Sequence, residues 1–241
     1  MTLLPPNGFA TIPEGALEVA LAKTWDALNP ELAIPRLRRY YDPTGDYAGA
    51  TFVDAQPVIP DEFTAADLFA LTLLSVDAPK PRVTRNFLDP GTRQDELTQL
   101  LRSAHLAGNQ DLAHADDDTL LAMRQLYRTV KSTLGTNPWV TASKLCARKR
   151  PALFPVRDKL IRNYLDLTRY DNYEIDWQLF RAIMRNHEVE TALHRLADTA
   201  RGDSAHLDNY PLRWLDAAFW MHARETTPAR SATVAADTQF A

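Results

Sequence analysis

Apolar residues recur every three or four positions along most of this 241-residue chain, and strictly alternating stretches are scarce. A period near 3.6 residues is typical of helices that bury one face. Thr64, followed by Asp67, also forms an acidic variant of the capping box that starts helices. The pattern predicts a mainly α, multi-helix single domain over residues 1–225. Its clearest helices are expected over 14–28, 30–40, 92–106, 118–133, 139–149, 176–186, 188–200 and 210–223.

The segment 39–52, RYYDPTGDYAGATF, is turn-rich and aromatic. Its centre, 42–46, favours a turn, so a short β-hairpin near residues 40–55 is the one β element that the pattern allows. The aromatic side chains of this segment are candidates to line a pocket for a flat ring; they are Tyr40, Tyr41 and Tyr47. The alternative is ordinary half-buried packing, which is common for such residues.

Composition limits the classes of protein that fit. The chain is 45% hydrophobic and 24% charged, which is ordinary for a globular domain. Its single cysteine excludes an internal disulfide and a multi-cysteine metal site. No apolar run reaches the roughly 18 residues of a membrane span, and the N-terminus lacks the basic region of a signal peptide. We expect a cytoplasmic protein with no membrane partner and, over residues 226–241, a disordered tail.

Residues 133–168 are the stretch whose order suggests chemistry. A turn is expected over 134–138, because Gly135 takes positive φ at no steric cost and Asn137 tolerates it. A helix follows from Trp139, prolines shape the next loop, and Asp158 opens a second helix. Backbone N–H groups at such a turn and helix start suit a phosphate.

The same stretch is basic, in a chain whose net charge is −4. Its basic residues are concentrated in the nineteen residues 144–162, where the single acid is Asp158; they are Lys144, Arg148, Lys149, Arg150, Arg157, Lys159 and Arg162. We predict that DNA phosphates contact the turn and the first helix. The predicted contacts are Gly135, Asn137, Lys144, Arg148, Lys149 and Arg150. The alternative for such a basic run is a solvated helix face.

The order turn, Trp, helix, proline-bounded loop, Asp resembles the helix-hairpin-helix DNA glycosylases. In this resemblance Leu134-Gly135-Thr136-Asn137 stands for the hairpin, and Pro155-Val156-Arg157-Asp158 for the segment that ends in the catalytic aspartate. It implies that Asp158 is catalytic and that Trp139 forms a pocket wall. Bifunctional members carry a lysine where Trp139 stands, so the resemblance implies a monofunctional enzyme. The chain departs from the pattern at Asn137, in place of a glycine, and at Arg157, which is inserted.

A second resemblance spans nearly the whole chain. The segments RYYDPTGDYAGATF, DLFALTLLSV, TASKLCARKRPALFPVRDKL and LRWLDAAFWM look like the recurring segments of an actinobacterial family of unknown function. This resemblance implies a single domain, and it implies no activity.

The residues and the two resemblances support three functional hypotheses. The first is a monofunctional DNA glycosylase, in which Asp158 stabilises the cationic sugar while a flipped base lies in the aromatic pocket. The second is a non-catalytic member of that fold that binds nucleic acid or a protein partner, with Asp158 acting only as a helix cap. The third is a small-molecule-binding helical protein with its pocket near residues 40–52. No GxGxxG, P-loop or GxSxG motif is present, and we expect no cofactor and no metal.

Overall fold

The computed structural model describes residues 5–6, 8–107, 110–136, 138–202 and 206–227. These residues form helices joined by turns and loops, with no strand among them. The helices are α1 (Ala16–Ala27), α2 (Pro30–Tyr40), α3 (Gly49–Asp54), α4 (Ala65–Leu73), α5 (Pro81–Leu88), α6 (Thr92–Leu101), α7 (Ala104–Ala107), α8 (Asp117–Leu134), α9 (Trp139–Lys149), α10 (Lys159–Tyr164), α11 (Tyr173–Met184), α12 (His187–Arg201) and α13 (Pro211–Thr226).

The predicted mainly α fold is confirmed, and most helices lie where the periodicity placed them. The single helix expected over 92–106 is divided into α6 and α7, because the chain turns at Arg102 and Ser103. The short helices α3 and α5 were not predicted. The predicted tail falls mostly on residues 228–241, outside the described residues, and α13 ends at Thr226.

The β-hairpin expected near residues 40–55 is wrong. After Tyr41 the chain makes a turn in which the Asp42 carboxylate accepts hydrogen bonds from the Thr44 backbone N–H, at 2.9 Å, and from its hydroxyl, at 2.7 Å. Gly49 then starts α3 at a φ of +31°. The turn itself was predicted correctly, but a short helix follows it in place of the second strand of a hairpin.

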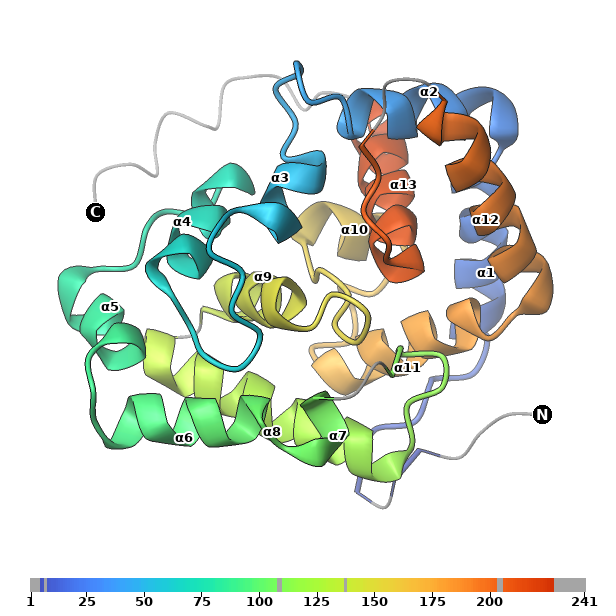
Figure 1. Ribbon diagram of the computed structural model, residues 1–241. Helices are drawn as coiled ribbons and strands as arrows, with labels where there is room; N and C mark the ends of the chain where they lie inside the picture. Colours follow the sequence, from blue (N-terminus) through green and yellow to red (C-terminus); the bar gives the residue numbers. More distant parts are fainter. Residues whose placement is uncertain (1–4, 7, 108–109, 137, 203–205, 228–241) are drawn as a thin grey trace, which may run out of the picture.

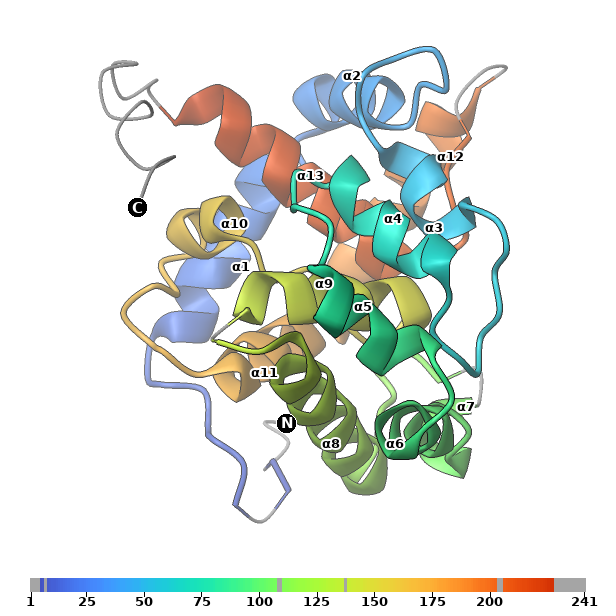
Figure 2. The ribbon, with the colours of Figure 1, turned by 90° about the vertical axis from the view of Figure 1, so that its left-hand side faces the viewer.

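One large apolar core joins most of the helices, and α9 lies at its centre (Figures 1 and 2), while Phe52, Val53 and Ala70 form a second, small cluster between α3 and α4. Helix α9 packs against α8 and α4, while α13 packs against α2, α10 and α12. The inner residues of α9 are small or aliphatic and fully buried: Ala142, Leu145, Cys146 and Ala147. Small side chains on this face of α9 allow α8 and α4 to approach it closely. Helices α9 and α13 therefore position the chain segments that begin and end beside them.

Gly49 sets how closely α3 approaches the end of α2. A Cβ atom at this position would lie 2.3 Å from the Tyr40 carbonyl oxygen and 2.9 Å from the Tyr41 Cα. Its positive φ also disfavours a side chain. We therefore predict that Gly49→Ala lowers the free energy of unfolding by about 2 kcal/mol or more, measured by urea denaturation. Gly91→Ala is the matched control, since nothing lies within 4 Å of its added Cβ; equal stability of the two variants would contradict the prediction.

Candidate functional site

The arginines and lysine that end α9 are buried, which differs from the expected DNA-binding surface. Arg148 donates to Asp67 Oδ1 at 3.0 Å and to the Phe52 carbonyl at 2.8 Å. Lys149 donates to Asp67 Oδ2 at 2.9 Å and to the Glu62 carbonyl at 2.7 Å. Their side chains are only 1% and 2% exposed.

Arg150, the third predicted phosphate contact at this end of α9, also turns inward. Its guanidinium donates to the carbonyls of Leu101 and Leu106, each at 2.6 Å, and of Pro60 at 2.7 Å. A buried cation is tolerated only where such acceptors surround it. Together the three residues hold the loop between α3 and α4 in place. Because their charged groups are used for these buried contacts, they support the fold and do not form a charged surface.

Four other residues that were predicted as phosphate contacts or pocket walls lie apart from one another or outside the described residues. Gly135 is exposed and ends α8 at a φ of +107°, while Asn137 lies outside the described residues. Trp139 is half-buried, with the guanidiniums of Arg157 and Arg162 centred 5.1 and 5.4 Å from its ring. Tyr41 is buried, and its hydroxyl donates to Asp208 Oδ2 at 2.9 Å. None of these described residues lines the pocket that holds Asp158.

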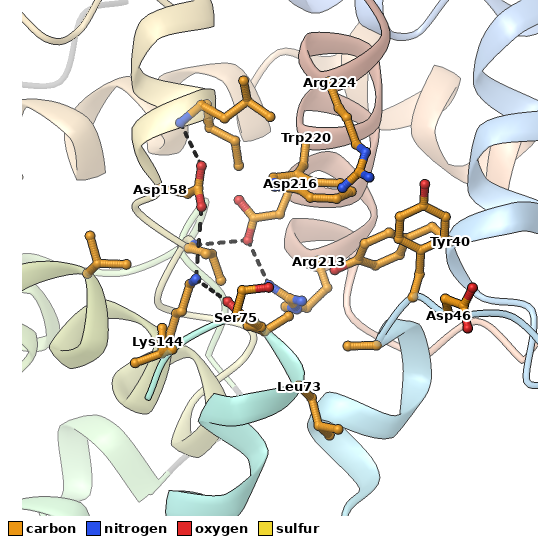
Figure 3. A pocket seen from close by; sticks show the side chains of 18 of the residues that line it. Tyr40, Asp46, Leu73, Ser75, Lys144, Asp158, Arg213, Asp216, Trp220 and Arg224 are labelled. Atoms are coloured by element: carbon orange, nitrogen blue, oxygen red, sulfur yellow. Dashed lines mark hydrogen bonds and ion pairs between the residues drawn. The ribbon is translucent and has the colours of Figure 1, made fainter. Parts of the chain in front are cut away.

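A pocket of about 940 Å³ does bring four of the predicted residues together. They are Tyr40, Tyr47, Lys144 and Asp158, and Figure 3 shows three of them labelled around one space. The walls come from the end of α2 with the turn after it, the end of α4, one side of α9, the start of α10 and one face of α13. Segments far apart in sequence therefore build a single cavity.

Asp158 lies at the start of α10 and has two neighbours. Its Oδ1 accepts a hydrogen bond from the Leu160 backbone N–H at 2.6 Å, as a helix-capping aspartate does. Its Oδ2 is 3.9 Å from Lys144 Nζ. The side chain is 19% exposed, so the carboxylate caps the helix and also faces the pocket.

Lys144 is held by the end of α4. Its Nζ donates to the Leu74 carbonyl at 2.7 Å. That carbonyl is aimed by a Schellman turn, in which Val76 N–H donates to the Leu71 carbonyl and Ser75 adopts a φ of +56°. Burial lowers the pKa of Lys144, while the nearby Asp158 carboxylate raises it. The lysine thus places a positive charge beside Asp158 at the bottom of the pocket.

Arg213 and Asp216 form a buried pair in the pocket that the sequence did not reveal. Arg213 Nη1 lies 3.2 Å from Asp216 Oδ2, and that oxygen also accepts from the Val156 backbone N–H at 2.9 Å. Asp216 Oδ1 is buried and has no hydrogen-bond partner in the part of the chain that the structure describes. In Figure 3 the carboxyl group of Asp216 faces the side on which Asp158 lies.

The two carboxyl groups have different surroundings. Burial raises the pKa of Asp216 to about 7, although Arg213 and the Val156 N–H lower it. Asp158, in contrast, sits at a partly exposed helix start. A raised pKa at a buried carboxyl group in a cavity is a feature of acid–base sites. The pocket therefore holds one carboxyl group that exchanges a proton near neutral pH and another that faces water.

Aromatic rings form the wall beyond these carboxyl groups. The rings of Tyr40 and Tyr47 stack at 6.1 Å with an interplanar angle of 27°. Trp220 meets Tyr47 edge-on at 5.7 Å and lies 6.1 Å from Tyr40. Tyr40 and Tyr47 were predicted as pocket residues, whereas Trp220 was not. Such a wall suits a flat ring.

The pocket residues on α13 were not predicted, although their spacing in the sequence indicates that they share one face of the helix. Arg213, Asp216, Trp220 and Arg224 succeed one another at intervals of three or four, so they share one face of the helix. The rest of this helix is strongly apolar, which is typical of a core helix, so the sequence did not predict a polar site on it. A charged pair three residues apart on an otherwise apolar helix is what a buried polar site requires, because each charge needs a partner.

The chain belongs to the family described as "Family of unknown function (DUF6308)", whose model matches residues 33–223. The expected membership in a family of unknown function is therefore confirmed. No curated protein and no solved structure matches the chain. In the described part of the chain, no helix is long and apolar enough to cross a membrane.

The burial of Arg148 and Lys149 leads to a stability prediction. Asp67→Asn keeps the shape of the side chain but leaves two buried cations without a counter-charge. We expect the free energy of unfolding to fall by about 3 kcal/mol or more, measured by urea denaturation. The control is Asp61→Asn, because Asp61 is 46% exposed and lies 3.4 Å from Arg150. That change should matter by less than about 1 kcal/mol; a silent Asp67→Asn would show that the cations reach solvent.

The raised pKa of Asp216 leads to a prediction about pH. A carboxyl group whose pKa is raised on folding contributes its full stability below its unfolded pKa of about 3.9, and loses it as the pH rises through about 7. Wild type should therefore lose stability relative to Asp216→Asn between pH 5 and pH 7, by at most about 1.4 kcal/mol per pH unit. Urea unfolding of both proteins across this range measures the difference; parallel pH profiles would contradict it.

Proposed function

We propose that the pocket binds a flat heterocyclic ring and that Asp158 and Asp216 together hydrolyse an N-glycosidic bond to that ring. One observation carries the proposal: two carboxyl groups in different surroundings, on α10 and α13, line one cavity of about 940 Å³ with an aromatic wall. Paired carboxyl groups with separate environments are how hydrolytic sites divide the acid and base roles.

Asp216 would act as the general acid. Near neutral pH a fraction of this carboxyl group holds a proton, and its Oδ1 has no hydrogen-bond partner among the described residues. In the reaction the glycosidic C–N bond breaks, the proton of Asp216 goes to the leaving nitrogen, and a positive charge develops on the sugar. Arg213, 3.2 Å away, then stabilises the carboxylate that remains.

Asp158 would meet the charge that develops on the sugar. Its carboxylate is partly exposed and fixed by the Leu160 N–H, so it needs little rearrangement to stabilise a cation. A water molecule attacks the anomeric carbon, a C–O bond forms, and a carboxylate of the pair accepts the proton that the water releases. Atoms and charge balance without a cofactor.

A small glycoside fits this site better than a long duplex. The residues predicted to hold DNA phosphates at the end of α9 donate instead to Asp67 and to backbone carbonyls. Among the described residues predicted to contact phosphates, only Lys144 lines the pocket. The reaction proposed from the glycosylase resemblance is kept here, with a small substrate as the first choice and duplex DNA as the alternative.

A second candidate is a binding protein without chemistry. It is favoured by the environment of Asp158, because Oδ1 already accepts a short hydrogen bond and Oδ2 lies near Lys144. In that case the aromatic wall and the free Asp216 Oδ1 hold a ligand that is released unchanged.

The test is release of free base from a panel of nucleosides, nucleoside monophosphates and lesion-containing duplexes. We expect wild type to release base from a small substrate, and Asp158→Asn to be at least about a hundredfold slower. Because Asn still accepts the capping hydrogen bond, Asp158→Asn should fold and bind as wild type does. The rate should fall as the pH rises through about 7, where Asp216 loses its proton.

The matched control is Asp116→Asn. Asp116 caps α8 by accepting from the Thr119 N–H at 2.8 Å, and it lies outside the pocket. It should leave the rate unchanged. Ligand binding with no base release by wild type would favour the binding protein over the enzyme, and base release by Asp158→Asn at the wild-type rate would remove Asp158 from the mechanism.

A further inference from the structure

Two exposed arginines stack on the ring of one tyrosine, Tyr47, at the outer edge of the pocket, which we call the rim. Arg39 and Arg224 both line the pocket, and their guanidinium carbons lie 5.4 and 5.5 Å from the centroid of the Tyr47 ring. Arg224 also lies 5.0 Å from the Trp220 centroid, and Figure 3 shows it beside Trp220 on α13. Stacking fixes a guanidinium on a ring and leaves its N–H edges available for hydrogen bonds.

The cations that line the pocket are only partly held by the protein's own acids. In the part of the chain that the structure describes, neither Arg224 nor Lys159 has an ion-pair partner, and both are exposed lining residues. Arg39 pairs with Glu225 at 3.0 Å and donates to the Tyr47 hydroxyl at 3.1 Å.

The turn after α2 also brings acids to the rim. Asp42 and Asp46 line the pocket too, but Asp42 is occupied by the two hydrogen bonds from Thr44. In the described residues neither acid forms an ion pair with Arg224, so its stacked guanidinium remains available as a donor on the aromatic wall.

The inner end of the pocket supplies an independent indication of a ligand. Asp216 is 3% exposed, it lines the pocket, and its Oδ1 has no hydrogen-bond partner within the described ranges. An unpaired buried oxygen costs stability unless a ligand or water satisfies it. A ligand that reaches from Asp216 to Arg224 passes the aromatic wall, so it needs a polar group inside, a flat ring along the wall and a negative group at the rim.

We propose that the ligand carries a phosphate monoester, bound by Arg224 with help from Arg39 and Lys159, and that the substrate is a nucleoside monophosphate instead of a neutral nucleoside. This inference rests on the proposed function for the ring and for the bond that breaks. A guanidinium fork matches two phosphate oxygens, and charge-assisted hydrogen bonds are the strong ones.

Calorimetry with the full-length protein tests this subsite. The probes are nucleoside 5′-monophosphates of the common bases, the matching nucleosides, and inorganic phosphate as a competitor. We expect the best monophosphate to bind at least about tenfold more tightly than its nucleoside, with a preference that decreases with salt. Arg224→Gln should reduce this preference to within about threefold and leave nucleoside affinity unchanged, and Arg224→Lys should restore part of it.

Arg102→Gln is the matched control, because Arg102 is an exposed arginine outside the pocket; the preference should be unchanged. Equal binding of monophosphate and nucleoside by wild type, or a full preference in Arg224→Gln, overturns the subsite. If monophosphates are preferred but no base is released, the hydrolysis is wrong and the subsite stands. If nucleosides are cleaved without any preference, the hydrolysis stands and the subsite is wrong. If neither class binds, both are overturned.

Discussion

The structure depends on one buried carboxylate, Asp67, shared by two consecutive cations at the end of α9. Neither Arg148 nor Lys149 reaches solvent, so their charge is tolerated only because Asp67 and backbone carbonyls surround them. The same contacts order the loop between α3 and α4, which has little regular structure of its own. They also fix α4 against α9, and the end of α4 supplies the Leu74 carbonyl that holds Lys144 in the pocket.

The helices were predictable because their signal is local. Periodicity and the Thr64–Asp67 capping box depend on residues a few positions apart, and both are present in the structure. The contacts of the basic residues, in contrast, depend on parts of the chain that are distant in sequence. Arg148 and Arg150 find acceptors in Phe52, Pro60 and Leu101, which lie tens of residues away in sequence. A basic run at a helix end has the same appearance in sequence whether it faces a phosphate, water or buried carbonyls.

The candidate site was predictable in part for the same reason. Asp158 comes after a proline-bounded loop and starts a helix, and Tyr40 and Tyr47 flank a turn, so each was visible from its neighbours. Asp216 was hidden because it lies in an apolar helix, and its acceptor role for Val156 N–H is a contact between distant segments. Only the three-residue spacing to Arg213 indicated that a polar pair was buried there.

That contact between α13 and Val156 links the two carboxyl groups through the backbone. Val156 lies two residues before Asp158, so the carboxyl group of Asp216 helps to position the segment that carries Asp158. Ser143 supports the same segment from α9, accepting from the Arg157 N–H at 2.8 Å. A ligand or proton that changes the charge on Asp216 therefore acts on the strength of the Val156 hydrogen bond, since bonds to a charged acceptor are stronger. The acid of the proposed pair thus helps to place the carboxylate that it works with.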